Sequence, residues 1–235
     1  MYITKGSDCD REENFDWQQY FSSNGSIGIR EQQDILVNVR ELLQENKFQL
    51  VLSFNTIMKN LLTGLNINKP QVLELGAATG VLTRWLMSQY GGNGVLVDRN
   101  KSSYDAYCAI KDDTKKNITY IVQDIFELEL EEQYDVVCSF GLIEHFKEKT
   151  EILRFHNKFL KENGIIIISV PLDSKLSRVF FEVHPELNLG YRELLTEREL
   201  VNILNAAGLK VVKSEISNGY SYDFLAVACM NYGNN

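Results

Sequence analysis

QVLELGAATGVLTRWLMSQY (71–90) decides the fold, because an apolar run turns through Gly76 and Gly80 into a stretch with helical spacing of apolar residues. A strand that passes through glycine into a helix offers backbone N–H groups and the positive helix end to a ligand. A dinucleotide fingerprint starting at Gly76 would need glycine at 78 and 81, where this chain has Ala78 and Val81. The turn therefore predicts a ligand site without a phosphate cradle.

Further apolar runs rich in Val and Ile follow this one. They are GVLVD (94–98), ITYIVQD (118–124), YDVVCSF (134–140) and GIIIISVP (164–171), separated by the helical patterns VLTRWLMSQY, SSYDAYCAIKD and TEILRFHNKFLKEN. Strands of continuous hydrophobicity that alternate with helices are typical of a parallel sheet covered on both faces. After a helix at 197–207, capped by Thr196, the runs 209–216 and 222–230 adjoin without a helix and predict an antiparallel hairpin. We predict a doubly wound, seven-stranded, mostly parallel α/β sheet that ends in this hairpin.

The chain divides unequally near Pro70. Residues 1–69 contain three helical patterns before the breaker NINKP, and they predict an N-terminal helical cap. Residues 70–235 form the predicted core, with an insertion at about 172–195 between the fifth strand and the next helix.

Composition excludes several classes of protein. The 235 residues are 44% apolar, enough for one domain or one domain with a small appendage. The net charge of -8 opposes phosphate backbones and makes nucleic acid an unlikely partner. The longest purely apolar run is too short to cross a membrane, and the four cysteines form no CxxC pair. We expect a cytoplasmic protein with free thiols, no structural zinc and no membrane partner.

Carboxylates stand at two strand ends, where ligands bind in such sheets. Asp98 closes the second strand and can accept hydrogen bonds from both hydroxyls of a ribose. Asp124 closes the third strand and can accept one from the exocyclic amine of adenine. Ribose and adenine without a phosphate cradle indicate an adenosine attached to something other than phosphate.

Taken together, these motifs resemble those of the class I S-adenosylmethionine-dependent methyltransferases. ELGAATG resembles the glycine-rich first motif, VLVD the ribose-binding second strand, IVQD the adenine-side third strand and YDVVCSFGLIEHF the fourth motif. FLKENGIIIISVP resembles the passage from helix to fifth strand, and the terminal hairpin is similar to the sixth and seventh strands. The resemblance covers roughly residues 70 to 230 in the family's order. Ala78 departs from the glycine that many members have there.

The resemblance implies a site for S-adenosylmethionine. Glu74 would orient the amino group of the methionine part, which packs on the loop from Gly76 to Gly80. The implied cofactor-binding set is Glu74, Gly76, Ala77, Gly80, Asp98, Arg99, Asp124, Ile125 and Phe140. Structural alternatives remain open, since Glu74 could pair with a local cation, Asp124 could cap a helix and Arg99 could be a solvated charge.

SFGLIEHF (139–146) supplies the candidate catalytic residue. The resemblance places His145 on the acceptor side of the methyl group, where it could take a proton from a hydroxyl or ammonium group, or only pack beside the cofactor. Glu144 is expected to support it. Some methyltransferases with ExxEH at this place hold a divalent ion, but Gly141 replaces the first glutamate, so no metal site is predicted.

The acceptor should be selected by the segments around the core. The candidate substrate-binding residues are Tyr20 and Arg30 in the N-terminal part, and His184, Tyr191 and Arg192 in the insertion. Together the two segments predict a lid that excludes water.

We predict methyl transfer from S-adenosylmethionine to a small molecule, with an oxygen acceptor preferred over nitrogen because His145 is available as a base. The alternatives are a protein or tRNA methyltransferase and a binding module for the cofactor without transfer activity; the acidic charge opposes tRNA. A nicotinamide oxidoreductase is opposed by the glycine spacing and the terminal hairpin.

Overall fold

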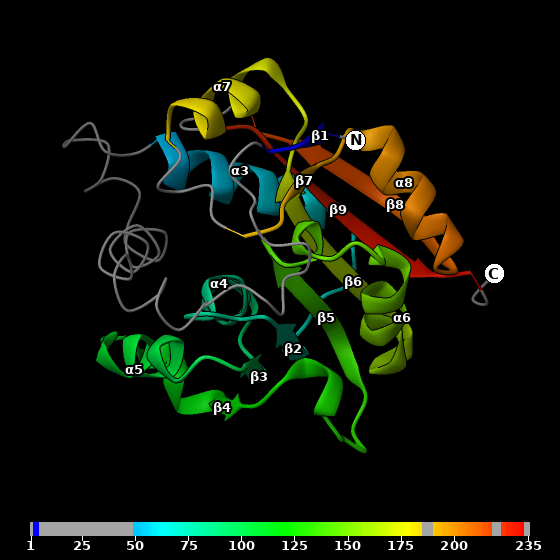
Figure 1. The fold of residues 1–235 in the computed structure, drawn as a ribbon. Helices are drawn as coiled ribbons and strands as arrows, with labels where there is room; N and C mark the ends of the chain where they lie inside the picture. The colour runs from blue at the N-terminus through cyan, green and yellow to red at the C-terminus, as the bar shows by residue number, and fades with distance from the viewer. Residues whose placement is uncertain (1, 5–48, 185–189, 218–221, 233–235) are drawn as a thin grey trace.

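The computed structural model describes residues 2–4, 49–184, 190–217 and 222–232, which build one seven-stranded sheet with helices on both faces (Figure 1). The order across the sheet is β4-β3-β2-β5-β6-β9-β8. The strands are β2 (Gln71–Leu75), β3 (Asn93–Asp98), β4 (Ile118–Val122), β5 (Tyr134–Phe140), β6 (Leu160–Pro171), β8 (Leu209–Ile216) and β9 (Phe224–Asn231). β2 to β6 pair in parallel, and β9 is antiparallel to both β6 and β8. The predicted fold class and terminal hairpin are confirmed.

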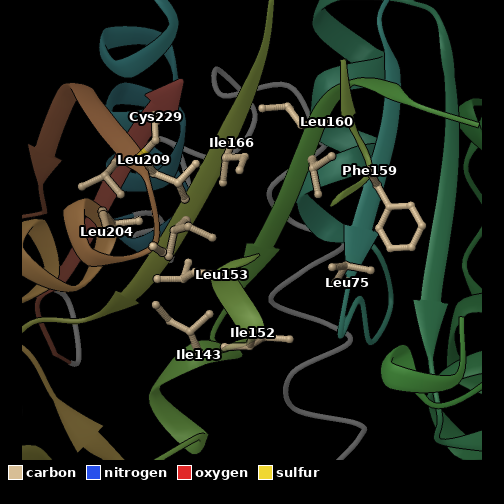
Figure 2. Packing of buried hydrophobic residues seen from close by; sticks show 14 of the residues in the cluster. Leu75, Ile143, Ile152, Leu153, Phe159, Leu160, Ile166, Leu204, Leu209 and Cys229 are labelled. Carbon is tan, nitrogen blue, oxygen red and sulfur yellow. The ribbon is translucent and has the colours of Figure 1, made fainter. Parts of the chain in front are cut away.

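Successive side chains along each strand point to opposite faces of the sheet and pack into two apolar layers, as a sheet covered on both faces requires. One layer holds α3 (Gln49–Leu62), α4 (Val81–Tyr90) and α5 (Lys101–Ala109); the other holds α6 (Lys149–Lys158) and α8 (Glu197–Ala206). In β2, Leu73 and Leu75 face the layer of α6 and α8, whereas Val72 faces that of α3 and α4. Figure 2 shows Leu75 and Ile166 of the sheet in the layer that Ile152 of α6 and Leu204 of α8 also line. Glu74 therefore points toward α4.

Helix α3 is part of this packing, although the sequence assigned it to the N-terminal cap. Phe54, Met58 and Leu61 are buried in the same cluster as Trp85 of α4. The Trp85 indole N–H donates to the side-chain oxygen of Asn55 at 2.7 Å. The other predicted cap helices lie outside the described residues, so the cap and its boundary near Pro70 stay predictions.

The end of α6 differs from the sequence prediction. The helical pattern continued to Asn163, but α6 ends at Lys158 and β6 already begins at Leu160. The Tyr134 N–H donates to the carbonyl of Phe159 at 2.8 Å, so the chain pairs with β5 directly after the helix ends. Long-range pairing overrides local helical spacing here.

A second, two-stranded sheet was not predicted. β1 (Tyr2–Ile3) pairs antiparallel with β7 (Glu193–Leu194) inside the predicted insertion, which also contains α7 (Lys175–Val183). The Thr4 N–H extends the pairing by donating to the carbonyl of Arg192 at 3.3 Å. Two-residue strands leave no period in a sequence, so pairing of this kind appears only in three dimensions.

Two further observations concern the described residues alone. Cys138 in β5 and Cys229 in β9 are buried free thiols, as predicted, and Cys108 is an exposed one. None of the described helices has the length and apolar character that crossing a membrane requires.

Candidate active site

The loop after β2 has the backbone of a close ligand-binding turn. Gly76 and Gly80 have φ angles of +60° and +70°, and Ala78 between them has +45°. A Cβ atom at Gly76 would lie 2.6 Å from Cδ1 of Leu142, and one at Gly80 would lie 2.3 Å from Cδ1 of Leu96. Both glycines are therefore required by conformation and by space. The contact with Leu142 also brings the segment after β5 against this loop.

Asp98 ends β3 and holds the same loop from the side. Its side chain is 5% exposed; one oxygen accepts from the Ala78 N–H at 2.8 Å, and the other accepts from the main-chain and side-chain N–H groups of Asn100 at 2.8 and 3.0 Å. Burial raises the pKa of Asp98 above its ordinary value, and these hydrogen bonds act against that rise. A carboxylate offers about four acceptor positions, so Asp98 can accept a further donor such as a ribose hydroxyl.

Asp124 lies at the next strand end and caps the short 3-10 helix η3 (Ile125–Glu127). One oxygen accepts from the Phe126 N–H at 2.9 Å, and the other lies 3.6 Å from Nη1 of Arg99. The capping alternative is thus present, and Arg99 lies beside Asp124 at the edge of the sheet. The Ile125 side chain is buried in the apolar layer of α6 and α8. Contacts of these three residues with adenine stay predictions.

Glu74 is 1% exposed and points into the first turn of α4. Its carboxylate accepts from the Thr83 N–H at 2.8 Å, and burial raises its pKa from 4.5 to about 7 although Arg84 acts in the opposite direction. Arg84 is itself buried, donates to the carbonyl of Thr79 at 3.1 Å and pairs with Asp112 at 3.1 Å. The sequence did not reveal Arg84, because an arginine on an amphipathic helix resembles a solvated residue. The role of Glu74 toward a cofactor amino group stays a prediction.

Two other predicted cofactor residues place their side chains in the apolar layers. Ala77 is buried with Leu96 and Tyr107, so only its main chain can face a ligand. Phe140 ends β5 and meets Phe54 edge to face, with ring centroids 5.7 Å apart.

The segment Gly141 to Phe146 positions the predicted catalytic histidine. The Gly141 N–H donates to the carbonyl of Ser169 at 2.9 Å, and the chain then forms the 3-10 helix η4 (Ile143–His145). Ile143 is buried in the layer of α6, and Figure 2 shows it near Ile152 and Leu153. The core thus fixes η4 at the carboxyl end of β5, next to the glycine loop.

His145 is 4% exposed, and its ring orientation is set by Tyr191. Nδ1 lies 2.6 Å from the Tyr191 carbonyl oxygen. Since a carbonyl oxygen only accepts, Nδ1 carries the hydrogen and Nε2 carries the lone pair of a neutral ring. Burial, followed by the charges of Arg192 and Lys149, lowers the pKa of His145 well below its ordinary value of 6.5. The ring is therefore neutral and has a defined tautomer, and its role as a base stays a prediction.

A buried cluster of charges lies around His145. Glu144 is 2% exposed, its Oε1 lies 3.9 Å from Nε2 of His145, and burial raises its pKa from 4.5 to about 7. Lys149, at the start of α6, pairs with Glu193 of β7 and donates to the carbonyl of Phe146 at 2.6 Å. Burial lowers the pKa of Lys149, and its pairing with Glu193 opposes that shift. Neither Lys149 nor Glu193 is marked as a site residue by the sequence pattern around it.

The structure separates the predicted substrate residues into three groups. Tyr191 and Arg192 lie beside His145, and the Arg192 guanidinium is 4.4 Å from the ring centroid of Phe181. His184 follows α7 and packs on Phe180 with ring centroids 4.9 Å apart. Tyr20 and Arg30 lie outside the described residues. In the described ranges no group of three or more His, Cys, Asp or Glu side chains is placed to hold a metal ion.

Comparison with known proteins identifies the family of the chain. The sequence model of a family described as "Methyltransferase domain" matches residues 39–214, which is more than half of the chain. The chain belongs to this methyltransferase family. A ubiquinone biosynthesis O-methyltransferase from Rickettsia typhi is 29% identical over 154 residues, covering 62% of this chain and 62% of the relative. The methyltransferase chain thus spans about three fifths of the length of such curated relatives.

Solved structures show the same fold. A magnesium protoporphyrin IX methyltransferase from Synechocystis PCC 6803, with bound S-adenosylhomocysteine, has a TM-score of 0.64 at 15% identity and covers 91% of this chain and 97% of its own. A 1,6-didemethyltoxoflavin-N1-methyltransferase from Burkholderia thailandensis has a TM-score of 0.57 at 16% identity, with coverage of 91% and 89%. The architecture is that of the class I S-adenosylmethionine-dependent methyltransferases, as the sequence resemblance implied.

Proposed function

We propose that this chain transfers the methyl group of S-adenosylmethionine to an oxygen atom of a small molecule, with His145 as the base. The observation that carries the proposal is the neutral His145 ring, whose Nδ1 is committed to the Tyr191 carbonyl and whose Nε2 holds the lone pair. This ring belongs to η4, which follows β5, and Leu142 at the start of that segment lies against the glycine loop.

The residues around that loop fit the cofactor. Gly76 and Gly80 give the loop a tight left-handed backbone that packs directly on Leu142 and Leu96, and Asp98 has acceptor capacity beyond its three hydrogen bonds. Asp124 and Arg99 follow on the adjacent strand ends, where adenine is expected. When bound, S-adenosylmethionine supplies a methyl group on a positively charged sulfur, which makes the methyl carbon reactive toward a nucleophile.

The base distinguishes oxygen from other acceptors. A neutral hydroxyl is a weak nucleophile and improves when a positioned base takes its proton, a contribution of about 10²–10⁴ in rate. The burial of His145 and Glu144 also keeps water away from the reacting group. Tyr191 and Arg192, next to His145, are proposed to contact the acceptor.

The curated relatives support an oxygen acceptor. The relative from Rickettsia typhi and a malonyl-[acyl-carrier protein] O-methyltransferase from Ilyobacter polytropus, 26% identical over 100 residues, are both named O-methyltransferases. A cytoplasmic site of reaction is part of the same proposal, because Cys138 and Cys229 are free thiols.

The test is incubation with methyl-labelled S-adenosylmethionine and fractionated small molecules from a cell extract. The labelled product is identified by mass spectrometry and NMR, and we expect the label on an ether or ester oxygen. Label on nitrogen would replace the oxygen proposal. Tight binding of S-adenosylhomocysteine without transfer to any fraction would favour a binding module instead.

A further inference from the structure

We propose that Glu144 stabilises the protonated form of His145 during methyl transfer and thereby sets the pH dependence of turnover. The inference rests on the proposed function and adds a second residue to it. Glu144 acts through His145, so it is a positioning residue and not the base.

The relative placement of the two side chains carries the first step. Oε1 of Glu144 lies 3.9 Å from Nε2 of His145, the nitrogen that holds the lone pair. The distance is too long for a hydrogen bond but short enough for strong attraction once Nε2 is protonated. Both side chains are almost fully buried, so water screens this attraction little.

The second step concerns Oε2 of Glu144, a buried oxygen without a hydrogen bond among the described residues. A buried carboxylate in that state is costly unless a cation accompanies it. Protonated His145 provides such a cation during turnover.

The third step is the charge that surrounds the pair. Arg192 precedes β7 and Lys149 begins α6, and both cations act on Glu144 and on His145. Glu193 of β7 pairs with Lys149, and the positive charges of Arg192 and Lys149 both lower the pKa of His145. A protonated His145 without Glu144 would therefore face like charge. On the solvent side, Lys147 lies 5.5 Å from the Tyr191 ring centroid, and Glu148 is exposed.

The proton and electron balance fits this role. His145 Nε2 takes the hydroxyl proton of the acceptor; the O–H bond breaks, its electron pair stays on oxygen, and the acceptor oxygen bonds to the methyl carbon. The carbon–sulfur bond breaks and its electron pair stays on sulfur. One positive charge thus moves from sulfur to the imidazole ring, next to Glu144. After the product leaves, the proton passes to solvent and the neutral ring is restored.

The titration of the two groups gives the inference a measurable signature. Burial places the pKa of Glu144 at about 7, whereas His145 stays neutral throughout that range. Turnover should therefore rise with pH as Glu144 ionises, even though the base itself does not titrate there.

The decisive experiment compares the pH profiles of kcat for wild type, Glu144→Gln and the matched control Glu148→Gln. At about pH 8 we expect Glu144→Gln to lower kcat at least tenfold, because the imidazolium loses its counter-charge. At about pH 5.5 wild-type Glu144 is protonated, so the two enzymes should differ by about twofold or less. The exposed Glu148→Gln should keep the wild-type profile, and the affinity for S-adenosylhomocysteine should be unchanged in both variants.

A second measurement needs no turnover. In urea unfolding, the free energy of unfolding of the wild type should fall between about pH 5 and 8. The fall should be smaller in Glu144→Gln, because a glutamine cannot ionise. The inference would be overturned if kcat depended on pH in the same way in Glu144→Gln and in the wild type. It would also be overturned if the free energy of unfolding fell equally with pH in both proteins. Absence of any methyl transfer by the wild type would instead overturn the proposed function, and the stability slopes would still report the charge of Glu144.

Discussion

Asp98 accepts a hydrogen bond from the backbone N–H of Ala78 at 2.8 Å, which ties the end of β3 to the glycine loop that follows β2. Two neighbouring strands therefore share one carboxylate at the point where ligands bind in a parallel sheet. Tyr120 of β4 adds a third link, because its hydroxyl donates to the Ala78 carbonyl at 2.7 Å. The glycine loop is thus held in place by hydrogen bonds to residues of the neighbouring strands.

Replacing Asp98 should weaken cofactor binding strongly. Asp98→Ala removes the proposed acceptor for the ribose and a support of the loop, so we expect the binding free energy of S-adenosylhomocysteine to weaken by about 1.5–3 kcal/mol, the scale of hydrogen bonds to charged groups. Isothermal titration calorimetry measures this directly. Asp105→Ala, which removes an exposed carboxylate on α5, is the control and should bind as the wild type does. Unchanged affinity in Asp98→Ala would remove the ribose assignment.

His145→Ala should separate chemistry from binding. Loss of a general base costs about 10²–10⁴ in rate, so kcat should fall at least a hundredfold while the affinity for S-adenosylhomocysteine changes by less than about threefold. His156 offers a contrast: its ring donates from Nδ1 to the Ile152 carbonyl at 2.7 Å and its Nε2 lies 3.0 Å from the Ser139 hydroxyl. His156→Ala should lower stability and leave the kcat of the folded protein near its wild-type value. Equal losses of kcat and affinity in His145→Ala would point to a structural role.

Glu74→Gln should change how stability depends on pH. The folded pKa of Glu74 is about 7, above its ordinary 4.5, so the folded state binds this proton more tightly than the unfolded chain does. The stabilising contribution is complete below about pH 4.5 and is lost as the pH rises through 7. The free energy of unfolding that Glu74 contributes at low pH and loses at high pH is about 3 kcal/mol. Glutamine keeps an acceptor for the Thr83 N–H and cannot ionise, so the variant should gain stability relative to the wild type between pH 5 and 8.

Urea unfolding at a series of pH values measures that gain. Glu151→Gln, which removes an exposed glutamate of α6, is the control and should follow the wild type. A constant difference between Glu74→Gln and the wild type at every pH would show that Glu74 does not titrate in this window.

Ala78→Gly should stabilise the protein. At φ +45° an alanine costs about 1–2 kcal/mol relative to glycine, whereas the greater freedom of glycine in the unfolded chain costs about 0.4–1 kcal/mol. The net gain should be about 0.5 kcal/mol in the free energy of unfolding, because both hydrogen bonds of Ala78 use its main chain. Ala77→Gly is the matched control: its buried methyl group is lost without relief of strain, so it should destabilise. A loss of stability in both variants would contradict the strain at Ala78.

The sequence predicted those parts of the fold that depend on neighbouring residues. Continuous apolar runs identified β2, β3 and β5, and Asp98 was found because it directly follows such a run. The start of α8 was predicted equally well, since Thr196 and Glu199 form the reciprocal capping hydrogen bonds that their spacing requires.

The parts that were missed depend on residues far apart in the chain. Lys149 and Glu193 are 44 positions apart, and each resembles a surface charge when read alone. The premature end of α6 is set by Tyr134, which pairs with the chain at Phe159 and Leu160. The tautomer of His145 likewise depends on a main-chain carbonyl, to which the identity of its side chain gives no clue.

The Lys149–Glu193 pair leads to a prediction about stability at the site. Removing one member leaves the other charge buried without its partner. Lys149→Met and Glu193→Leu should therefore each destabilise the protein by about 3–5 kcal/mol. The double variant removes both desolvation costs and should recover most of that loss. Urea unfolding of the four proteins gives the coupling energy as a double-mutant cycle. Additive losses in the double variant would show that the two charges are not coupled, and that β7 is held beside His145 by other contacts.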